Sequence, residues 1–203
     1  MALSPKKRST VQHLVNVTTA WDNKNGAANF QLINEGVTDL TEDLNPETDD
    51  LQYVAEDEKT HVVKTYAPAI TLSAVMVDPE KDKVNEWMQK VINKLPKGDE
   101  ADTAYIRFNV LKDLATAQEQ ADGKHKYEAY KRDAVVEASS IGGAAGDNVE
   151  MEVTISGKGE AKKGILTIDK SGTTPTYDFT PDSTTTTNTP SGQSLEEDTY
   201  SLR

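Results

Sequence analysis

The chain has 203 residues, of which 35% are hydrophobic, a net charge of −12 and no cysteine. This length is enough to enclose a hydrophobic core, whereas the missing cysteines exclude disulfides, thiolate metal sites and thiol nucleophiles. The negative charge argues against a nucleic-acid-binding protein, because binding phosphates requires Lys and Arg to displace counterions.

The N-terminal zone begins with a basic arm at 1–10 and a strand-like run at 11–17. The stretch 35–58 follows, with ten Asp or Glu and no Lys or Arg. Gly36 and Pro46 within it favour turns over a helix, and neighbouring carboxylates repel one another. We therefore expect a long solvated loop, with short extended edges at most, that is poorly ordered in the isolated chain.

An amphipathic helix is predicted at 79–95, because six apolar residues recur there at spacings of three and four. These residues are Val84, Trp87, Met88, Val91, Ile92 and Leu95. Asp78 is the expected N-cap with Pro79 at the first helical position, and Pro96 and Gly98 end the helix. We interpret the stripe as core packing rather than as a ligand site.

On both sides of this helix the apolar residues alternate, which predicts antiparallel strands. The core residues expected from these strands are Ile106, Phe108, Val110, Val149, Met151, Val153 and Ile155. Residues 117–124, which end on an Asp-Gly pair, are predicted to form a hairpin tip. The runs 104–114 and 125–138 are expected to have open edges through which copies associate. The predicted fold class is mainly β (α+β), with one helix packed across a face of the sheet.

The C-terminal zone, 171–203, holds 15 Ser or Thr residues and few large apolar ones. Such a segment cannot bury enough surface to offset its ordering entropy, so we expect a tail that is disordered or ordered only by a partner. The expected organisation is an arm at 1–10, a β domain at 11–170 and this tail.

No chemical signature is evident. His13, His61 and His125 lie in different elements without a second ligand at metal spacing, and we expect them to be surface or strand residues. The Gly-rich segment 142–146 lacks the Lys-Ser/Thr pair of a phosphate loop. No segment approaches the roughly 20 apolar residues of a membrane span. We therefore expect a soluble protein without catalytic residues, cofactor, metal or membrane partner, although scattered carboxylates leave weak divalent-cation binding open.

The middle of the chain, taken as a unit, carries a family resemblance. An apolar strand ending in Asp78-Pro79 leads into the helix, followed by strands at 105–110 and 127–136, a Gly-rich turn, and a strand that ends near Gly159. This order resembles the major tail proteins, the tail tube subunits, of long-tailed bacteriophages of Gram-positive bacteria. The resemblance covers about half of the chain.

The resemblance implies a β-sandwich or barrel-like domain with one flanking helix. It implies a virion protein assembled in the host cytoplasm, whose hexameric rings stack into the tail tube that conducts DNA during ejection. The implied partners are further copies of the chain, the tape measure protein, the tail terminator and the distal tail protein, with DNA only passing through.

Two sets of site residues follow from this resemblance. Long loops and terminal arms bridge rings in the family, so the inter-ring candidates are Asp39, Glu42, Asp43, Asp49, Asp50, Lys6, Lys7 and Arg8. An acidic lumen would prevent DNA from sticking, so the lumen-facing candidates are Glu150, Glu152, Thr154 and Ser156, on the polar side of the strand after the Gly-rich turn. The alternative for the second set is an ordinary solvent-facing surface.

Two other classes of protein stay open. A non-enzymatic β-sandwich binding or adhesion module of a virion is disfavoured by the low aromatic content of 6%, because carbohydrate sites need exposed rings. An enzyme with an unrecognised pair of carboxylates is disfavoured because no apolar pocket around such a pair is evident.

Overall fold

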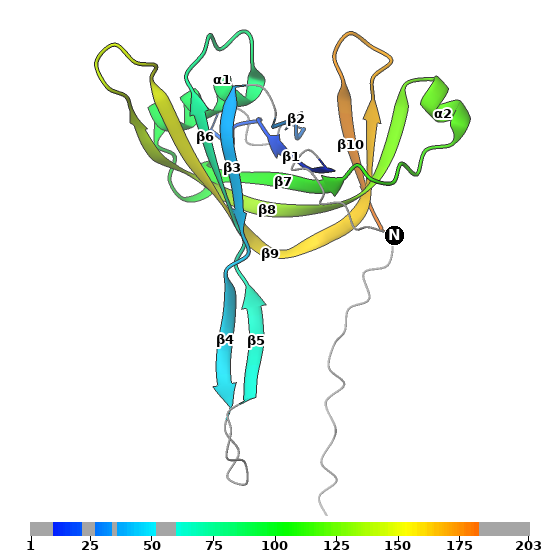
Figure 1. Cartoon of the computed structure of the whole chain (residues 1–203), viewed down its shortest axis with the longest axis horizontal. Helices are drawn as coiled ribbons and strands as arrows, with labels where there is room; N and C mark the ends of the chain where they lie inside the picture. The colour runs from blue at the N-terminus through cyan, green and yellow to red at the C-terminus, as the bar shows by residue number, and fades with distance from the viewer. Residues whose placement is uncertain (1–9, 22–26, 34–35, 52–59, 183–203) are drawn as a thin grey trace, which may run out of the picture.

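The computed structural model of the chain describes residues 10–21, 27–33, 36–51 and 60–182. Strands predominate, and a single longer helix lies against them (Figure 1). The elements are β1 (Val11–Asn16), β2 (Phe30–Leu32), β3 (Val37–Asp43), β4 (Pro46–Leu51), β5 (Thr60–Tyr66), β6 (Ala69–Val75), α1 (Lys83–Lys94), a 3-10 turn η2 (Gly98–Ala101), β7 (Asp102–Asn109), α2 (Ala117–Ala121), β8 (Lys124–Gly142), β9 (Glu150–Asp169) and β10 (Thr176–Pro181).

One antiparallel sheet forms the body, with strand order β2-β1-β7-β8-β9-β6-β3. The long strands β8 and β9 pair along their whole length. The other edge of β9 is shared, because β6 pairs with its first part and β10 with its last part. The sheet curls into a half-barrel with α1 against it (Figure 1). The mainly β architecture predicted from the sequence is therefore confirmed.

The prediction that residues 104–114 and 125–138 form open sheet edges is wrong. β7 and β8, which occupy most of these residues, are interior strands of the sheet. β1 pairs with the outer side of β7, although the two strands lie far apart in the sequence. The edge strands of the main sheet, among the described strands, are instead β2 and β3 at the two ends of this order and β10 beside the last part of β9.

Two hydrophobic cores lie on opposite faces of this sheet. Val15 of β1 and Tyr105 of β7 belong to the first core, whereas their chain neighbours Leu14 and Ile106 belong to the second. Successive residues of a strand point to opposite faces, so the same strands serve both cores. The helix α1 supplies the first core with its apolar stripe, and β10 packs against the second.

Most residues that the sequence assigns to the core are buried. They are Val84, Trp87, Met88, Val91, Ile92, Ile106, Phe108, Met151, Val153 and Ile155. Val110 is partly buried against the second core. Leu95 and Val149 are the exceptions, with exposed fractions of 60% and 42%. Leu95 follows α1 in a left-handed conformation (φ 51°) that takes it off the helical stripe, and Val149 precedes β9 at the end of a protruding hairpin.

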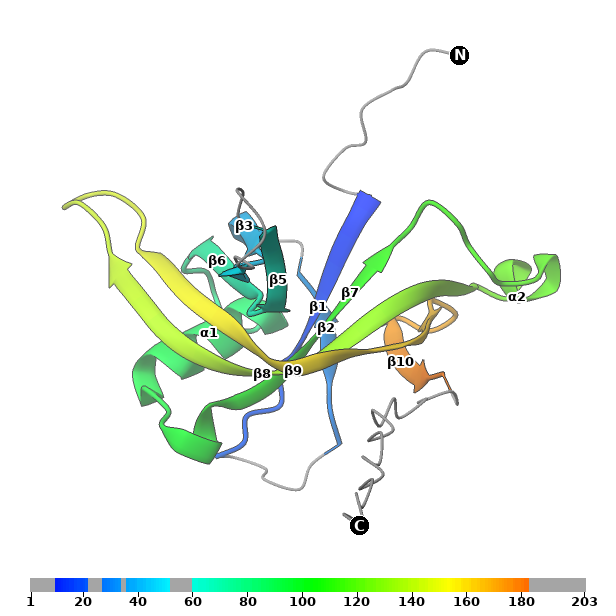
Figure 2. The ribbon, with the colours of Figure 1, turned by 90° about the horizontal axis from the view of Figure 1, so that it is seen from below.

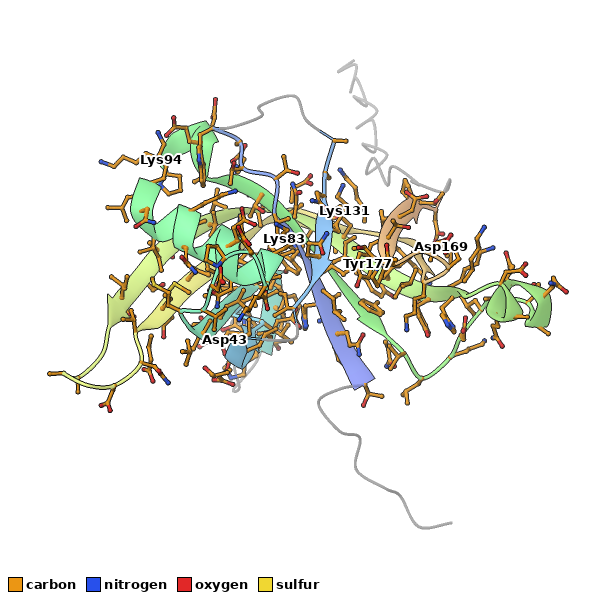
Figure 3. The ribbon with its side chains drawn as sticks, turned by 90° about the horizontal axis from the view of Figure 1, so that it is seen from above. Asp43, Lys83, Lys94, Lys131, Asp169 and Tyr177 are labelled. Carbon is orange, nitrogen blue, oxygen red and sulfur yellow. The ribbon has the colours of Figure 1, made fainter. Side chains whose placement is uncertain are left out.

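The helix α1 begins later than the sequence predicts, at Lys83 (labelled in Figure 3). Its N-cap is Asp82, whose Oδ1 accepts hydrogen bonds from the backbone N–H groups of Val84 and Asn85 at 2.8 and 2.9 Å. Asp78, the predicted N-cap, accepts a hydrogen bond within the preceding turn instead. Both aspartates suit a helix start, and only the one aligned with the apolar stripe begins the helix.

The acidic stretch is not a loop. It forms β3, which extends the main sheet beside β6, and β4, which pairs with β5 in a separate two-stranded sheet. The prediction of a loop at 35–58 is therefore wrong for 36–51, while residue 35 and residues 52–58 lie outside the described residues. Pairing across strands brings these carboxylates next to cations that are distant along the chain.

The expected hairpin tip at 117–124 contains the short helix α2. Thr116 and Glu119 form a capping box, in which the Thr116 N–H donates to Glu119 Oε2 at 2.9 Å. Lys126 donates to the other carboxylate oxygen. Hydrogen bonds from Lys126 first, and then from Thr116, lower the pKa of Glu119 to about 2. The capping box explains why this connection is helical rather than a tight turn.

The predicted tail is partly folded, because β10 pairs with the end of β9. Tyr177 (labelled in Figure 3) and Phe179 pack against the second core. Gly164 of β9 makes room for this strand, since an added Cβ would lie 2.7 Å from Cζ of Phe179. The tail prediction is thus wrong for the strand itself, and 183–203 lie outside the described residues.

Candidate functional site

A hairpin of β4 and β5 projects from the body like an arm (Figure 1). Asp49 Oδ2 lies 2.8 Å from Lys64 Nζ, and Asp50 Oδ1 lies 2.6 Å from His61 Nδ1. The predicted inter-ring residues Asp49 and Asp50 thus lie on this arm and are paired across it. Ordered cross-strand pairs, rather than free carboxylates, characterise the described part of the arm.

The other inter-ring candidates are separated by the structure. Asp39 and Asp43 are exposed on the edge strand β3. Lys6, Lys7 and Arg8 lie outside the described residues. Glu42, on the same strand, has a side chain that is only 15% exposed and is paired with Arg107 within the chain, so its role in contacts between rings stays a prediction.

Glu42 joins strands from the two sides of the curled sheet. Its Oε2 lies 3.1 Å from Nε2 of His13 in β1, and its Oε1 accepts a hydrogen bond at 3.2 Å from Nη1 of Arg107 in β7. Burial by itself raises the pKa of Glu42, but the hydrogen bonds and charges of His13 and Arg107 outweigh this and leave the pKa below its ordinary value. His13, expected to be a surface or strand residue, is a strand residue with an exposed fraction of only 1%.

A groove lies beside the base of the arm. Hollows of about 260 Å³ and about 700 Å³ share part of their lining, including Glu42 and Arg107. We call this region the arm-side groove and define it by Leu44, Tyr66, Arg107, Leu111, Leu114 and Tyr130. The guanidinium of Arg107 lies 6.0 Å from the ring centre of Tyr130. No sequence pattern indicated this groove, because its residues are spread along the chain from Leu44 to Tyr130.

The four predicted lumen residues share one surface, as expected. Glu150, Glu152, Thr154 and Ser156 alternate along β9 with the buried residues of the first core. On either side, their register partners on β6 and β8 include Ser73 and Glu137 and contain no Lys or Arg. We call this surface the polar face of β9. These register positions therefore carry carboxylates and hydroxyls without a cation, and the next cation along β9, Lys158, is paired with Asp102.

Within the described residues, no group of three or more His, Asp or Glu is arranged to hold a metal ion. In the same residues, no helix is long and apolar enough to cross a membrane. Several described titratable groups with shifted pKa values form structural pairs, such as Lys163 with Glu128 and Lys83 with Glu86, and burial alone raises the pKa of Tyr177. Extended surfaces, rather than a chemical centre, are thus the features that this geometry offers.

Comparisons with known proteins found likeness in structure alone. No protein family model and no curated protein sequence matches the chain. The SPP1 tail tube protein, solved by solid-state NMR and cryo-EM, matches over 88% of this chain and 81% of its own, with 10% identity and a TM-score of 0.51.

Two further structures match less well. The tail of an empty gene transfer agent particle with C6 symmetry covers 77% of this chain and 97% of its own, at 11% identity and a TM-score of 0.47. The sheath/tube terminator of the PVC extracellular contractile injection system covers 82% and 99%, at 11% identity and a TM-score of 0.45. The fold of this chain is therefore that of a tail tube protein, as seen in the SPP1 tail tube.

Proposed function

We propose that this chain is the repeating subunit of a phage tail tube, in which hexameric rings stack into a conduit for DNA. The observation that carries the proposal is the fold shared with the SPP1 tail tube protein over 88% of this chain. The structure adds two features that suit a polymer: an arm that projects beyond the body, and two surfaces of contrasting chemistry.

The arm is the element best suited to bridge successive rings. None of the described side chains of β4 and β5 is buried in either core, so the packing of the body does not depend on them. A two-stranded hairpin alone is marginally stable in water, which favours a role in which a neighbouring copy covers it. Asp49 and Asp50 are paired within the arm, so its outer contacts rest on its other exposed side chains, such as Val63.

The polar face of β9 is the surface best suited to line the lumen. DNA moving through a tube must not bind its wall, and carboxylates without nearby Lys or Arg form no phosphate contacts. Glu150 and Glu152, with Glu137 from β8, would give each subunit a patch of this kind. Six copies would surround the DNA with negative charge.

The proposed function places the protein in the virion tail, with a structural role and no reaction to catalyse. Its partners would be further copies of itself along the tube, the tape measure protein inside it, and terminator and distal tail proteins at its ends. DNA would pass through without a lasting contact.

Electron microscopy of the concentrated full-length protein tests this function. We expect rings or tubes with six-fold symmetry, and scattering that shows growing assemblies as the concentration rises. A strictly monomeric mass up to about millimolar concentration, with no tubes in the micrographs, would contradict the tail tube function. It would favour the β-sandwich binding module instead.

A further inference from the structure

The arm-side groove gathers the exposed apolar side chains of the molecule. Among the described residues, ten large hydrophobic side chains are exposed, and five of them line the two hollows of the groove. These five are Val11, Leu44, Tyr66, Leu111 and Leu114. Scattered exposed apolar residues are normal on a protein surface, whereas a gathered set marks an interaction site.

The polar residues of the groove fit an interface as well. Arg107 and Tyr130 belong to the residue types that are enriched at protein interfaces and at their energetic centres. Arg107 is held by Glu42 on one side and lies over the Tyr130 ring on the other, so its orientation is fixed before any partner binds. Lys112 at the groove margin supplies an exposed positive charge.

A second exposed apolar feature lies elsewhere on the body, at the hairpin that joins β8 to β9 (Figure 2). Its tip, 141–149, consists of small and apolar residues apart from Asp147 and Asn148, and all of it is exposed. Ile141 and Val149 flank the tip with exposed fractions of 52% and 42%. The Gly, Asp and Asn residues are ordinary turn residues, whereas the exposed Ile141 and Val149 give the two sides of the tip an apolar surface that a partner can cover.

The tip is held in place and matches the groove in size and charge. The Val149 carbonyl accepts a hydrogen bond at 2.8 Å from the Met76 N–H, which fixes the base of the hairpin to the end of β6. Small side chains such as Ala144 let a narrow hairpin enter a groove of about 700 Å³. Asp147 on the tip is opposite in charge to Lys112 at the groove margin, where the neighbouring carboxylate, Glu128, is already paired with Lys163 at 2.9 Å.

Copies that repeat around a ring or along a tube meet through a heterologous contact, in which one patch binds a different patch of the next copy. The groove and the tip are two such patches: the groove is lined by residues at the base of the arm and after β7, whereas the tip ends the β8–β9 hairpin, which projects from another part of the body (Figures 1 and 2). We infer that the 141–149 hairpin of one copy docks into the arm-side groove of a neighbouring copy. The inference rests on the proposed function, because it names the surfaces by which the polymer forms.

Disulfide cross-linking tests this contact cleanly, because the chain has no cysteine of its own. One batch carries Leu111→Cys in the groove and a second carries Ala144→Cys in the tip. The two are mixed, assembled and oxidised. We expect a cross-linked dimer in the mixture and none in either batch alone. Leu95→Cys, at a residue 60% exposed outside the groove, replaces Leu111→Cys in a matched control that should give no dimer.

A charge exchange gives an independent reading without oxidation. Lys112→Asp and Asp147→Lys should each raise the critical concentration for assembly, by roughly threefold to tenfold, and the double variant should restore it. Tubes that assemble from the mixed cysteine variants without forming the Leu111/Ala144 cross-link, together with charge effects that simply add, would overturn the docking contact and leave the tube function standing. Failure of the wild-type chain to assemble at all would remove the proposed function and the contact with it.

Discussion

Nε2 of His13 lies 3.1 Å from Oε2 of Glu42, although β7, β8, β9 and β6 separate their two strands in the order of the sheet. The contact is possible only because the sheet curls until β3 approaches β1. Glu42 also binds Arg107 of β7, so a single carboxylate ties the edge strand β3 to the opposite side of the half-barrel.

Replacing Glu42 by Gln should therefore weaken the link between β3 and the opposite side of the half-barrel, and the loss of stability should depend on pH. The folded-state pKa of Glu42 is lowered, so its stabilisation is fully present above the pKa of the unfolded chain and is lost as the pH falls through the folded pKa. We expect Glu42→Gln to cost about 1–3 kcal/mol at pH 7 and less at a pH below the ordinary pKa of glutamate, measured by urea unfolding. Asp43→Asn, on the exposed neighbour, is the control. An equal cost at both pH values would show that charge is not the cause.

Trp87 and Leu95 form a matched pair for testing α1. Trp87 has an exposed fraction of 2% in the first core, whereas that of Leu95 is 60% just beyond the helix. Trp87→Ala should lower the free energy of unfolding by roughly 3–5 kcal/mol, and Leu95→Ala should change it by no more than about 0.5 kcal/mol. Thermal or chemical denaturation measures both. Equal melting of the two variants would contradict the burial of Trp87.

Removing the arm should abolish tube formation without unfolding the body. The Ala67 N–H donates to the Asn45 carbonyl at 3.1 Å, so the two ends of the arm already lie side by side. Residues 46–66 can thus be replaced by a two-residue Asn-Gly turn. We expect circular dichroism to show a folded chain with a melting temperature close to that of the full protein. Tubes of normal length from this variant would rule out the bridging role of the arm.

The capping box of α2 should be visible in a titration. NMR of the Glu119 carboxyl is expected to give a midpoint near pH 2, because Lys126 and Thr116 stabilise the charged form. The capping interaction then persists as the pH falls below the pKa of the unfolded chain and is lost only near this midpoint. Lys126→Ala should raise the midpoint, whereas Lys124→Ala, on the same strand, should leave it unchanged.

Gly164 and Gly142 provide a test of β10. An added Cβ at Gly164 would clash with the Thr180 carbonyl and lie 2.7 Å from the Phe179 ring, while one at Gly142 would meet nothing within 4 Å. Gly164→Ala should cost roughly 1–3 kcal/mol and increase hydrogen exchange in 176–181, and Gly142→Ala should do neither. Unchanged exchange in the first variant would mean that β10 does not pack as described.

The sequence predicted well what depends on local periodicity. The stripe through Trp87 and the alternation through Met151 and Ile155 identified a helix face and a strand face that are buried. The ends of the helix were harder to predict, because Asp78 and Asp82 are both good N-caps and only packing against the sheet selects between them.

What the sequence could not predict depends on partners distant along the chain. Counting carboxylates between residues 35 and 58 ignored Lys64 of β5, whose Nζ lies 2.8 Å from Asp49 Oδ2. Tyr177 was assigned to a tail because its own segment is poor in apolar residues, yet β9 supplies the surface on which it packs. The arm-side groove could not be predicted from the sequence for the same reason, since only the curl of the sheet brings Leu44 and Leu111 together.

The arm continues the strands of the body almost without interruption. Only two residues separate β3 from β4, and only two separate β5 from β6. A pull on the arm along its length therefore acts on β6 parallel to its pairing with β9, which extends from Ala69 opposite Ser156 to Val75 opposite Glu150. Loaded in this direction, the hydrogen bonds resist in shear and share the force, instead of opening one after another as in peeling. The subunit is thus built to carry tension through its arm into the middle of its sheet.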